Sequence, residues 1–212
     1  MASNSTAGLT LDKKLSEIAS SGKTPRLLLH CCCAPCASYV LEYLSPYFAI
    51  TILFYNPNIR PVGEYRKREA ELNRLLSLAA YPNRVDMLPC VYDAEVFDAV
   101  ALPFWEEPEG GRRCRECFDL RLRQTAKRAR DGGYDYFATT LSVSPHKNAV
   151  VLNEVGNRMA EEYGVEYLDS DFKKRDGYKR SIILSKQYGL YRQSYCGCMM
   201  NMGGEDIAYD KN

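Results

Sequence analysis

The sequence predicts an α/β fold: a doubly wound, nucleotide-binding-like parallel sheet of about five strands in the order 3-2-1-4-5, with a cysteine-rich C-terminal segment. Short β-branched and aromatic runs alternate with longer segments whose apolar residues recur at helical spacing. This alternation is typical of parallel strands joined by right-handed helical crossovers. A chain of 212 residues, 46% of them hydrophobic, is long enough to bury one core.

The N-terminal residues differ in composition from the rest of the chain. We expect residues 1–24 to form a peripheral N-terminal extension and residues 25–212 a single α/β domain. The extension is rich in Ser, Thr and Lys and carries one short amphipathic stretch, formed by Leu11, Leu15 and Ile18. It lacks the apolar centre of a signal peptide, and the chain has no apolar run long enough to span a membrane. We therefore expect a cytoplasmic protein without a membrane partner.

The first two strands have the clearest local signatures. Residues 27–31 form an apolar run that ends at a turn-like Ala-Pro, and a helix over about 36–45 follows. The β-branched and aromatic run over 48–55 ends at Asn-Pro-Asn, and leucines at helical spacing predict a helix over 62–80.

The remaining elements continue the alternation, and Asp-Gly-Gly at 131–133 and Gly164 are helix-ending signals. We expect strands over 87–92, 136–140 and 165–168, and helices over 94–102, 115–130 and 147–163. A loop and a helix then lead from Lys173 into the C-terminal YRQSYCGC. In the predicted strand order, the loops after the first and fourth strands face each other across one crevice, where such sheets bind ligands.

Cysteines are the most unusual feature of the composition. There are nine, and most are grouped: Cys31, Cys32, Cys33, Cys36, Cys90, Cys114, Cys117, Cys196 and Cys198. In a reducing compartment, grouped thiols indicate metal ligands or catalytic thiols rather than a disulfide framework. Cys31 and Cys90 lie inside strand runs, so we interpret them as small buried hydrophobic residues.

Each cysteine group has a chemical interpretation. Cys32, Cys33 and Cys36 follow the first strand at a helix N-terminus, where backbone N–H groups favour thiolates. Cys114 and Cys117 have the spacing that places two sulfurs on one helix face, as zinc and iron–sulfur sites require. Cys196-Gly-Cys198 is either a redox couple or a pair of ligands. A closed zinc site made from Cys32, Cys33, Cys114 and Cys117 would leave the other three unexplained, which favours a redox cluster over zinc.

Charge gives a weaker indication. The net charge is +1, but basic residues gather over 66–68, 112–130 and 173–180. Each such run, taken alone, is more typical of a solvated helix face. Together with 16 tyrosines they favour RNA, whose bases stack on aromatic rings while its phosphates meet Arg and Lys. His30 and His146 are candidate proton donors or ligands, although a histidine in a strand is more often a core residue.

Five ordered motifs between about residues 26 and 198 together resemble the QueH-type epoxyqueuosine reductases, which are cobalamin-independent enzymes of queuosine synthesis in tRNA. They are HCCCAPC (30–36), FYNPNIRPVGEYRKR (54–68), Cys114-x-x-Cys117 with its downstream LRLRQTA, FATTLSVSPHKN (137–148) and YRQSYCGC (191–198). One departure is Arg60, where the family favours His, and we assign that position no role.

The resemblance implies reduction of the epoxide of epoxyqueuosine to queuosine at the wobble position of a tRNA anticodon loop, with electrons from an external donor. It implies a [4Fe–4S] cluster on Cys32, Cys33, Cys114 and Cys117, a redox-active pair of Cys196 and Cys198, and Cys36 as a candidate ligand of an additional iron. Two alternatives stay open: an iron–sulfur-dependent tRNA-thiolating enzyme, and a zinc-stapled RNA-binding module. The first would use a Ser/Gly-rich phosphate loop after the first strand, where this chain has cysteines.

Overall fold

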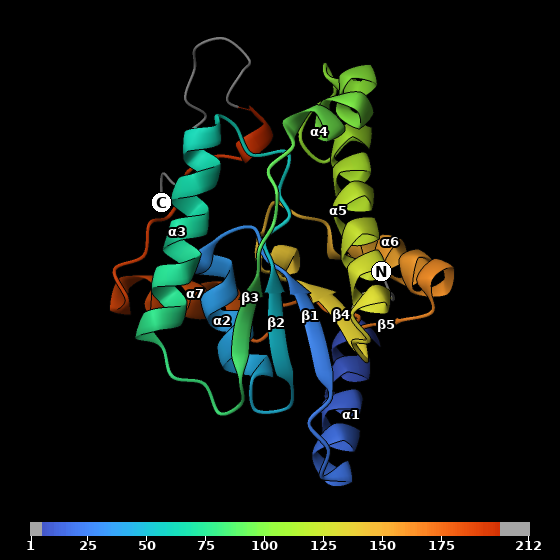
Figure 1. Cartoon of the computed structure of the whole chain (residues 1–212), viewed down its shortest axis with the longest axis vertical. Helices are drawn as coiled ribbons and strands as arrows, with labels where there is room; N and C mark the ends of the chain where they lie inside the picture. Colours follow the sequence, from blue (N-terminus) through green and yellow to red (C-terminus); the bar gives the residue numbers. More distant parts are fainter. Residues whose placement is uncertain (1–5, 200–212) are drawn as a thin grey trace.

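The computed structural model describes residues 6–199 and contains the predicted parallel sheet, with the order β3-β2-β1-β4-β5 (Figure 1). The strands are β1 (Arg26–His30), β2 (Ala49–Leu53), β3 (Val85–Leu88), β4 (Tyr136–Thr139) and β5 (Glu166–Tyr167). All four strand pairings are parallel. The α/β fold class and the strand order are therefore confirmed. Residues 200–212 of the predicted domain lie outside the described residues.

Helices cover both faces of the sheet (Figure 1). α5 (Arg112–Asp131) and α6 (Ala149–Tyr163) pack on one face, and α2 (Ala34–Leu44), α3 (Val62–Leu78) and α7 (Gly177–Gln187) lie on the other. α4 (Ala94–Ala101) rests against α5 beyond the strand ends. Three short 3-10 turns complete the fold: η1 (Leu102–Phe104), η2 (Thr140–Val143) and η3 (Gly197–Met199).

The central strand shows why the apolar run after Arg26 is continuous. Leu27 and Leu29 point into the core beneath α2, whereas Leu28 points into the core beneath α5. All three side chains are fully buried. Successive residues of a strand face opposite sides, so a strand covered on both faces needs apolar residues at every position.

Several element boundaries differ from the prediction by a few residues, and two of the differences have a clear cause. The third strand ends at Leu88 rather than at 92, because Pro89 has no N–H to continue the ladder. The first core helix begins at Ala34 rather than at 36, because a proline in the first helical turn, here Pro35, loses no intrahelical hydrogen bond.

The amphipathic stretch near the N-terminus forms α1 (Thr6–Ser21). Its Leu11, Leu15 and Ile18 are buried in the same cluster as the residues of α2 and α3. The Lys14 ammonium also lies 2.7 Å from a Glu166 carboxylate oxygen on β5. Within the predicted peripheral segment, α1 therefore contributes three side chains to the main core. Across residues 6–199 the structure has no helix that is both long and apolar enough to cross a membrane.

Candidate metal and redox site

The first part of the site is the turn between β1 and α2. The backbone amide of Cys31 continues the ladder to the carbonyl of Leu53 at 3.1 Å, and its own carbonyl accepts a 2.8 Å hydrogen bond from Asn56 Nδ2. Cys33 is the N-cap residue of α2 and makes no side-chain capping bond. The turn is thus fixed by its backbone, which leaves the next thiols available as ligands.

Three sulfur atoms meet at this turn. The Sγ atoms of Cys32, Cys33 and Cys36 lie within 4.8 Å of one another, close enough to share a metal ion. Hydrogen bonds from the Cys32 and Cys36 thiols lower the pKa of Cys33 well below its ordinary value. The hydrogen bond between Cys32 and Cys33 raises the pKa of Cys32 to about 12. This turn therefore holds one thiolate and two thiol donors, and Cys32, Cys33 and Cys36 could bind a metal.

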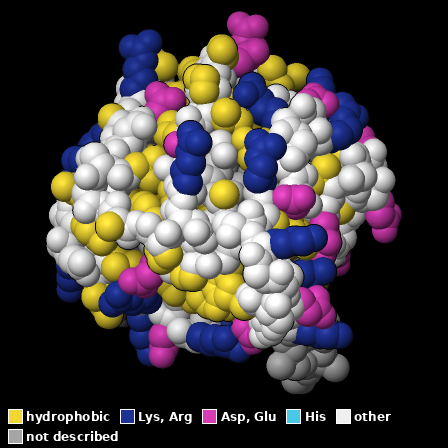
Figure 2. Space-filling view, turned by 60° about the horizontal axis from the view of Figure 1, so that its bottom comes forward, with side chains coloured by type: hydrophobic (Ala, Val, Ile, Leu, Met, Phe, Trp, Pro, Cys, Tyr) yellow, Lys and Arg dark blue, Asp and Glu magenta, His cyan; other side chains and the backbone are white. Residues whose placement is uncertain are grey.

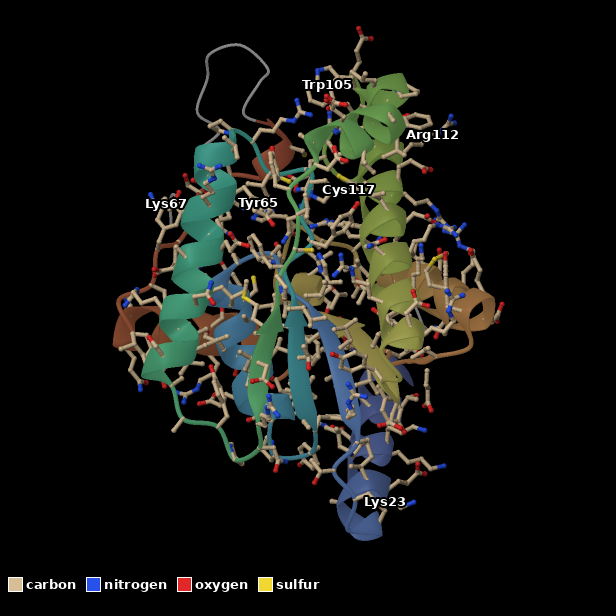
Figure 3. All side chains as sticks on the ribbon, viewed as in Figure 1. Lys23, Tyr65, Lys67, Trp105, Arg112 and Cys117 are labelled. Carbon is tan, nitrogen blue, oxygen red and sulfur yellow. The ribbon has the colours of Figure 1, made fainter. Side chains whose placement is uncertain are left out.

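Cys114 and Cys117 are buried residues of the first turns of α5. Figure 3 shows Cys117 on the inner side of this helix. The backbone amide of Gly110 donates to Cys114 Sγ at 3.2 Å, which is a favourable contact for a thiolate. Both side chains line a small cavity of about 250 Å³ together with Cys196 and Cys198. The structure thereby brings two of the predicted cysteine groups to one place.

Cys196 and Cys198 form a close pair of thiols, with their sulfur atoms 3.5 Å apart. Lys147 Nζ lies 3.7 Å from Cys196 Sγ and also forms an ion pair with Glu109. The hydrogen bond from Cys198 and then the charge of Lys147 lower the pKa of Cys196, although burial opposes this. The same bond raises the pKa of Cys198. Cys196 is thus the thiolate of the pair.

An open pocket of about 950 Å³ adjoins the small cavity. Cys32 and Cys36 line one wall, and Cys196 and Lys147 line another. Cys196, Lys147 and Arg121 border both cavities. Residues from the loops after β1 and β4 therefore meet in one crevice, as the strand order predicts.

Several candidate residues lie elsewhere. His30 is fully buried, with its ring nitrogens 3.0 Å from Thr139 Oγ1 and 3.1 Å from the Tyr55 carbonyl, so it is a satisfied core residue. Burial, and then the nearby Arg121 charge, lower its pKa to about 3. His146, by contrast, lines the open pocket. The basic groups of 112–130 and 173–180 largely form surface ion pairs, such as Arg123 with Glu162 and Arg180 with Glu42.

The sequence motifs do not identify two charged pairs at the site as pairs, although three of the four residues lie within those motifs. Arg68 is buried and its Nε lies 2.6 Å from Glu64 Oε1, one helical turn earlier. Lys147 pairs with Glu109, which comes from a loop 38 positions away. Spacing along α3 indicates the first pair, because residues four apart share a helix face. No local signal indicates the second pair, since its residues meet only in the folded chain.

Comparison with known proteins identifies the family. A sequence model of the family described as Epoxyqueuosine reductase QueH matches residues 27–203. The chain belongs to the QueH family. A relative named Epoxyqueuosine reductase QueH from Streptococcus pyogenes serotype M1 is 44% identical over 191 residues, which are 88% of this chain and 75% of the relative. Another of the same name, from Thermotoga maritima, is 34% identical over 179 residues, which are 83% of this chain and 90% of the relative. The QueH match spans the five motifs and every cysteine of the site.

Proposed function

We propose that this chain reduces the epoxide of epoxyqueuosine in tRNA to the alkene of queuosine. The observation that carries the proposal is the convergence of three cysteine segments on two adjoining cavities at the switch point of the sheet. Membership of the QueH family supports the same reaction. A tRNA substrate and nine unpaired cysteines both fit the cytoplasm.

Four of the cysteines are our proposed ligands of a [4Fe–4S] cluster: Cys32, Cys33, Cys114 and Cys117. Cys33, Cys114 and Cys117 are buried and Cys32 is half-buried, and a purely sulfur donor set suits such a cluster. Cys36, the third thiol of the β1–α2 turn, is our candidate ligand for an additional iron. When bound, an iron–sulfur cluster supplies electrons one at a time.

The reaction requires two electrons and two protons, because the epoxide oxygen leaves as water and the two ring carbons become an alkene. The Cys196 thiolate and the Cys198 thiol supply the two electrons and one of the protons as they form a disulfide, and the Lys147 ammonium supplies the other proton. An external donor must then reduce the disulfide. Lys147 holds a proton beside Cys196 and supplies positive charge where negative charge develops on the departing oxygen.

The open pocket has the composition of a nucleotide site. Arg68, Arg121, Lys147 and Arg192 line it, with Glu109 as their acidic neighbour. The rings of Tyr178 and Tyr195 offer faces for stacking an unpaired base. Within the described part of the chain, Asn58 Oδ1 and Gln193 Oε1 are buried without a hydrogen-bond partner. Both residues line the pocket, so these acceptors are suited to donors on the modified base.

The thiolation and zinc alternatives explain less of this site. The turn after β1 carries three cysteines in place of a glycine-rich phosphate loop, which leaves ATP without a cradle. A zinc staple needs four ligands and gives no role to the close pair of Cys196 and Cys198.

The test is a direct assay of the product. We would reconstitute the full chain anaerobically with iron and sulfide, add dithionite and an anticodon stem-loop containing epoxyqueuosine, and weigh the released nucleoside. Loss of one oxygen is the expected result. Cys196→Ser should abolish turnover, whereas Cys90→Ser should retain it because Cys90 borders neither cavity. An unchanged nucleoside mass in the presence of a verified cluster would refute the proposal.

A further inference from the structure

Arg121 is a buried cation whose direct partners are neutral. Its side chain is 3% exposed. Nε donates to the Cys117 carbonyl at 3.2 Å and Nη1 to Asn56 Oδ1 at 3.4 Å. Among residues 6–199, no carboxylate forms an ion pair with it. Arg68 provides the contrast, because it is 4% exposed and paired with Glu64.

A buried guanidinium without an anion is strongly unfavourable, and arginine does not escape by losing its proton. The compensating negative charge must therefore come from nearby groups. Burial lowers the pKa of Arg121, and the cysteines of the site, Cys117 first and then Cys32, Cys196 and Cys198, oppose this when they are ionised. As ligands of a cluster, Cys32 and Cys117 would be thiolates. His30, whose pKa is lowered by burial and then by the Arg121 charge, stays neutral and contributes no negative charge.

Arg121 also borders both cavities, and the proposed cluster ligands approach it from two elements. Cys117 lies one helical turn before it on α5, and Cys32 follows β1. A [4Fe–4S] cluster with four thiolate ligands carries a net negative charge, which grows by one unit on reduction. A fixed cation at this position favours the more negative, reduced form.

We propose that Arg121 is the built-in counter-charge of the sulfur centre and that it raises the reduction potential of the cluster held by Cys32, Cys33, Cys114 and Cys117. This inference rests on the proposed cofactor but not on the proposed RNA substrate. Arg121 is thus a positioning residue: it acts on the electrons of the centre through its charge.

The test measures the potential of the cluster in the anaerobically reconstituted full chain without RNA, by a redox titration followed by electron paramagnetic resonance. Arg121→Gln should shift the potential to more negative values, and Arg121→Lys should stay close to the parent protein. Lys127→Gln is the matched control, because it removes the same charge from an exposed position of the same helix. It should leave the potential unchanged, since solvent screens that charge.

A second variant keeps Arg121 and offsets its positive charge with a negative charge placed beside it. Asn56→Asp places a carboxylate against Arg121 and should shift the potential in the same direction as Arg121→Gln, even if the latter does not fold. An unchanged potential in both, or a negative shift of equal size in Arg121→Lys, would overturn the inference and leave the reductase proposal intact. A parent chain that assembles no cluster would overturn both the cofactor proposal and this inference.

Discussion

Two groups act on the sulfur of Cys196: the Cys198 thiol at 3.5 Å and the Lys147 ammonium at 3.7 Å. The thiol hydrogen bond is the larger cause of its lowered pKa. The Cys196 thiolate therefore persists as the pH falls through the ordinary thiol range, and Cys198→Ala should move its ionisation to higher pH. Alkylation of the cluster-free chain by iodoacetamide, followed at Cys196 by peptide mass spectrometry across pH 5–10, checks this. If Cys198→Ala left the pH dependence of Cys196 alkylation unchanged, the prediction would be wrong. Cys90→Ala is the control and should leave it unchanged.

Lys147 is the second residue whose removal has a specific consequence. Burial lowers its pKa, but the Cys196 thiolate and the Glu109 carboxylate more than offset this and raise it, so the ammonium keeps its proton. Lys147→Met removes both a proton donor and a positive charge from the pocket. We expect single-turnover reduction of the stem-loop to slow by at least about 100-fold. Lys127→Met is the control and should react as fast as the parent. A Lys147→Met rate within about twofold of the parent rate would exclude a role for Lys147 as proton donor and positive charge.

At the residue scale, sequence motifs single out the cysteines but not the charged pairs around them. The seven proposed site cysteines fall in three short segments, and the structure brings these segments together at the two cavities. Arg121 belongs to a basic run that resembles a solvated helix face, yet its position on α5 turns it inward toward Cys117. Lys147 and Glu109 meet through tertiary structure alone. Local spacing carries no information about such contacts.

Among the elements, strand boundaries depend on single residues. The third predicted strand runs too far because Cys90-Val91-Tyr92 resembles a strand in composition, whereas the missing N–H of Pro89 ends the ladder at Leu88. The end of α6 is confirmed at Gly164, whose φ of 68° lies in the left-handed region that favours glycine. A boundary set by one residue is thus predicted where that residue is read as a signal, as at Gly164, and missed where the following residues resemble a strand, as after Pro89.

α1 gives an element-scale prediction. Leu15 is 3% exposed and packs in the main core cluster. Leu15→Ala should lower the free energy of unfolding by about 2–4 kcal/mol, because it removes buried methyl groups and leaves a cavity. Urea denaturation of the metal-free chain measures this. Lys13→Ala, on the exposed side of the same helix, should change it by less than about 0.5 kcal/mol. If Leu15→Ala and Lys13→Ala changed the free energy of unfolding equally, α1 would be peripheral.

In the molecule as a whole, charge is distributed unevenly between the pocket and the outer surface. On the face shown in Figure 2, basic and acidic side chains lie interspersed, without a large area of one sign. Lys23 lies at this end of the molecule, far from Cys117 and the cavities (Figure 3). The arginines and the lysine of the open pocket lie instead at the carboxyl ends of the strands. The open pocket therefore offers a small number of cations to RNA, so phosphate contacts should be few and local.

Substitution of Arg192 tests whether the cations of the open pocket bind RNA phosphates. It lines the open pocket, and its only recorded side-chain hydrogen bond among the described residues is a 3.3 Å contact from Nη1 to Ser185 Oγ, so no carboxylate competes with a phosphate there. Arg192→Gln should weaken binding of the stem-loop several-fold at low salt and reduce the dependence of log K on log salt concentration by about one. Fluorescence anisotropy between about 50 and 200 mM salt measures both quantities.

Arg130→Gln is the matched control for this measurement. Arg130 lies at the far end of α5 and is already paired with Asp131 at 2.8 Å, so its loss should alter neither affinity nor salt slope. Equal effects of the two substitutions would mean that RNA senses the total charge of the chain. An effect confined to Arg192 would mean that the crevice above β1 and β4 holds the phosphates, and that the same topology which gathers the cysteines also positions the RNA.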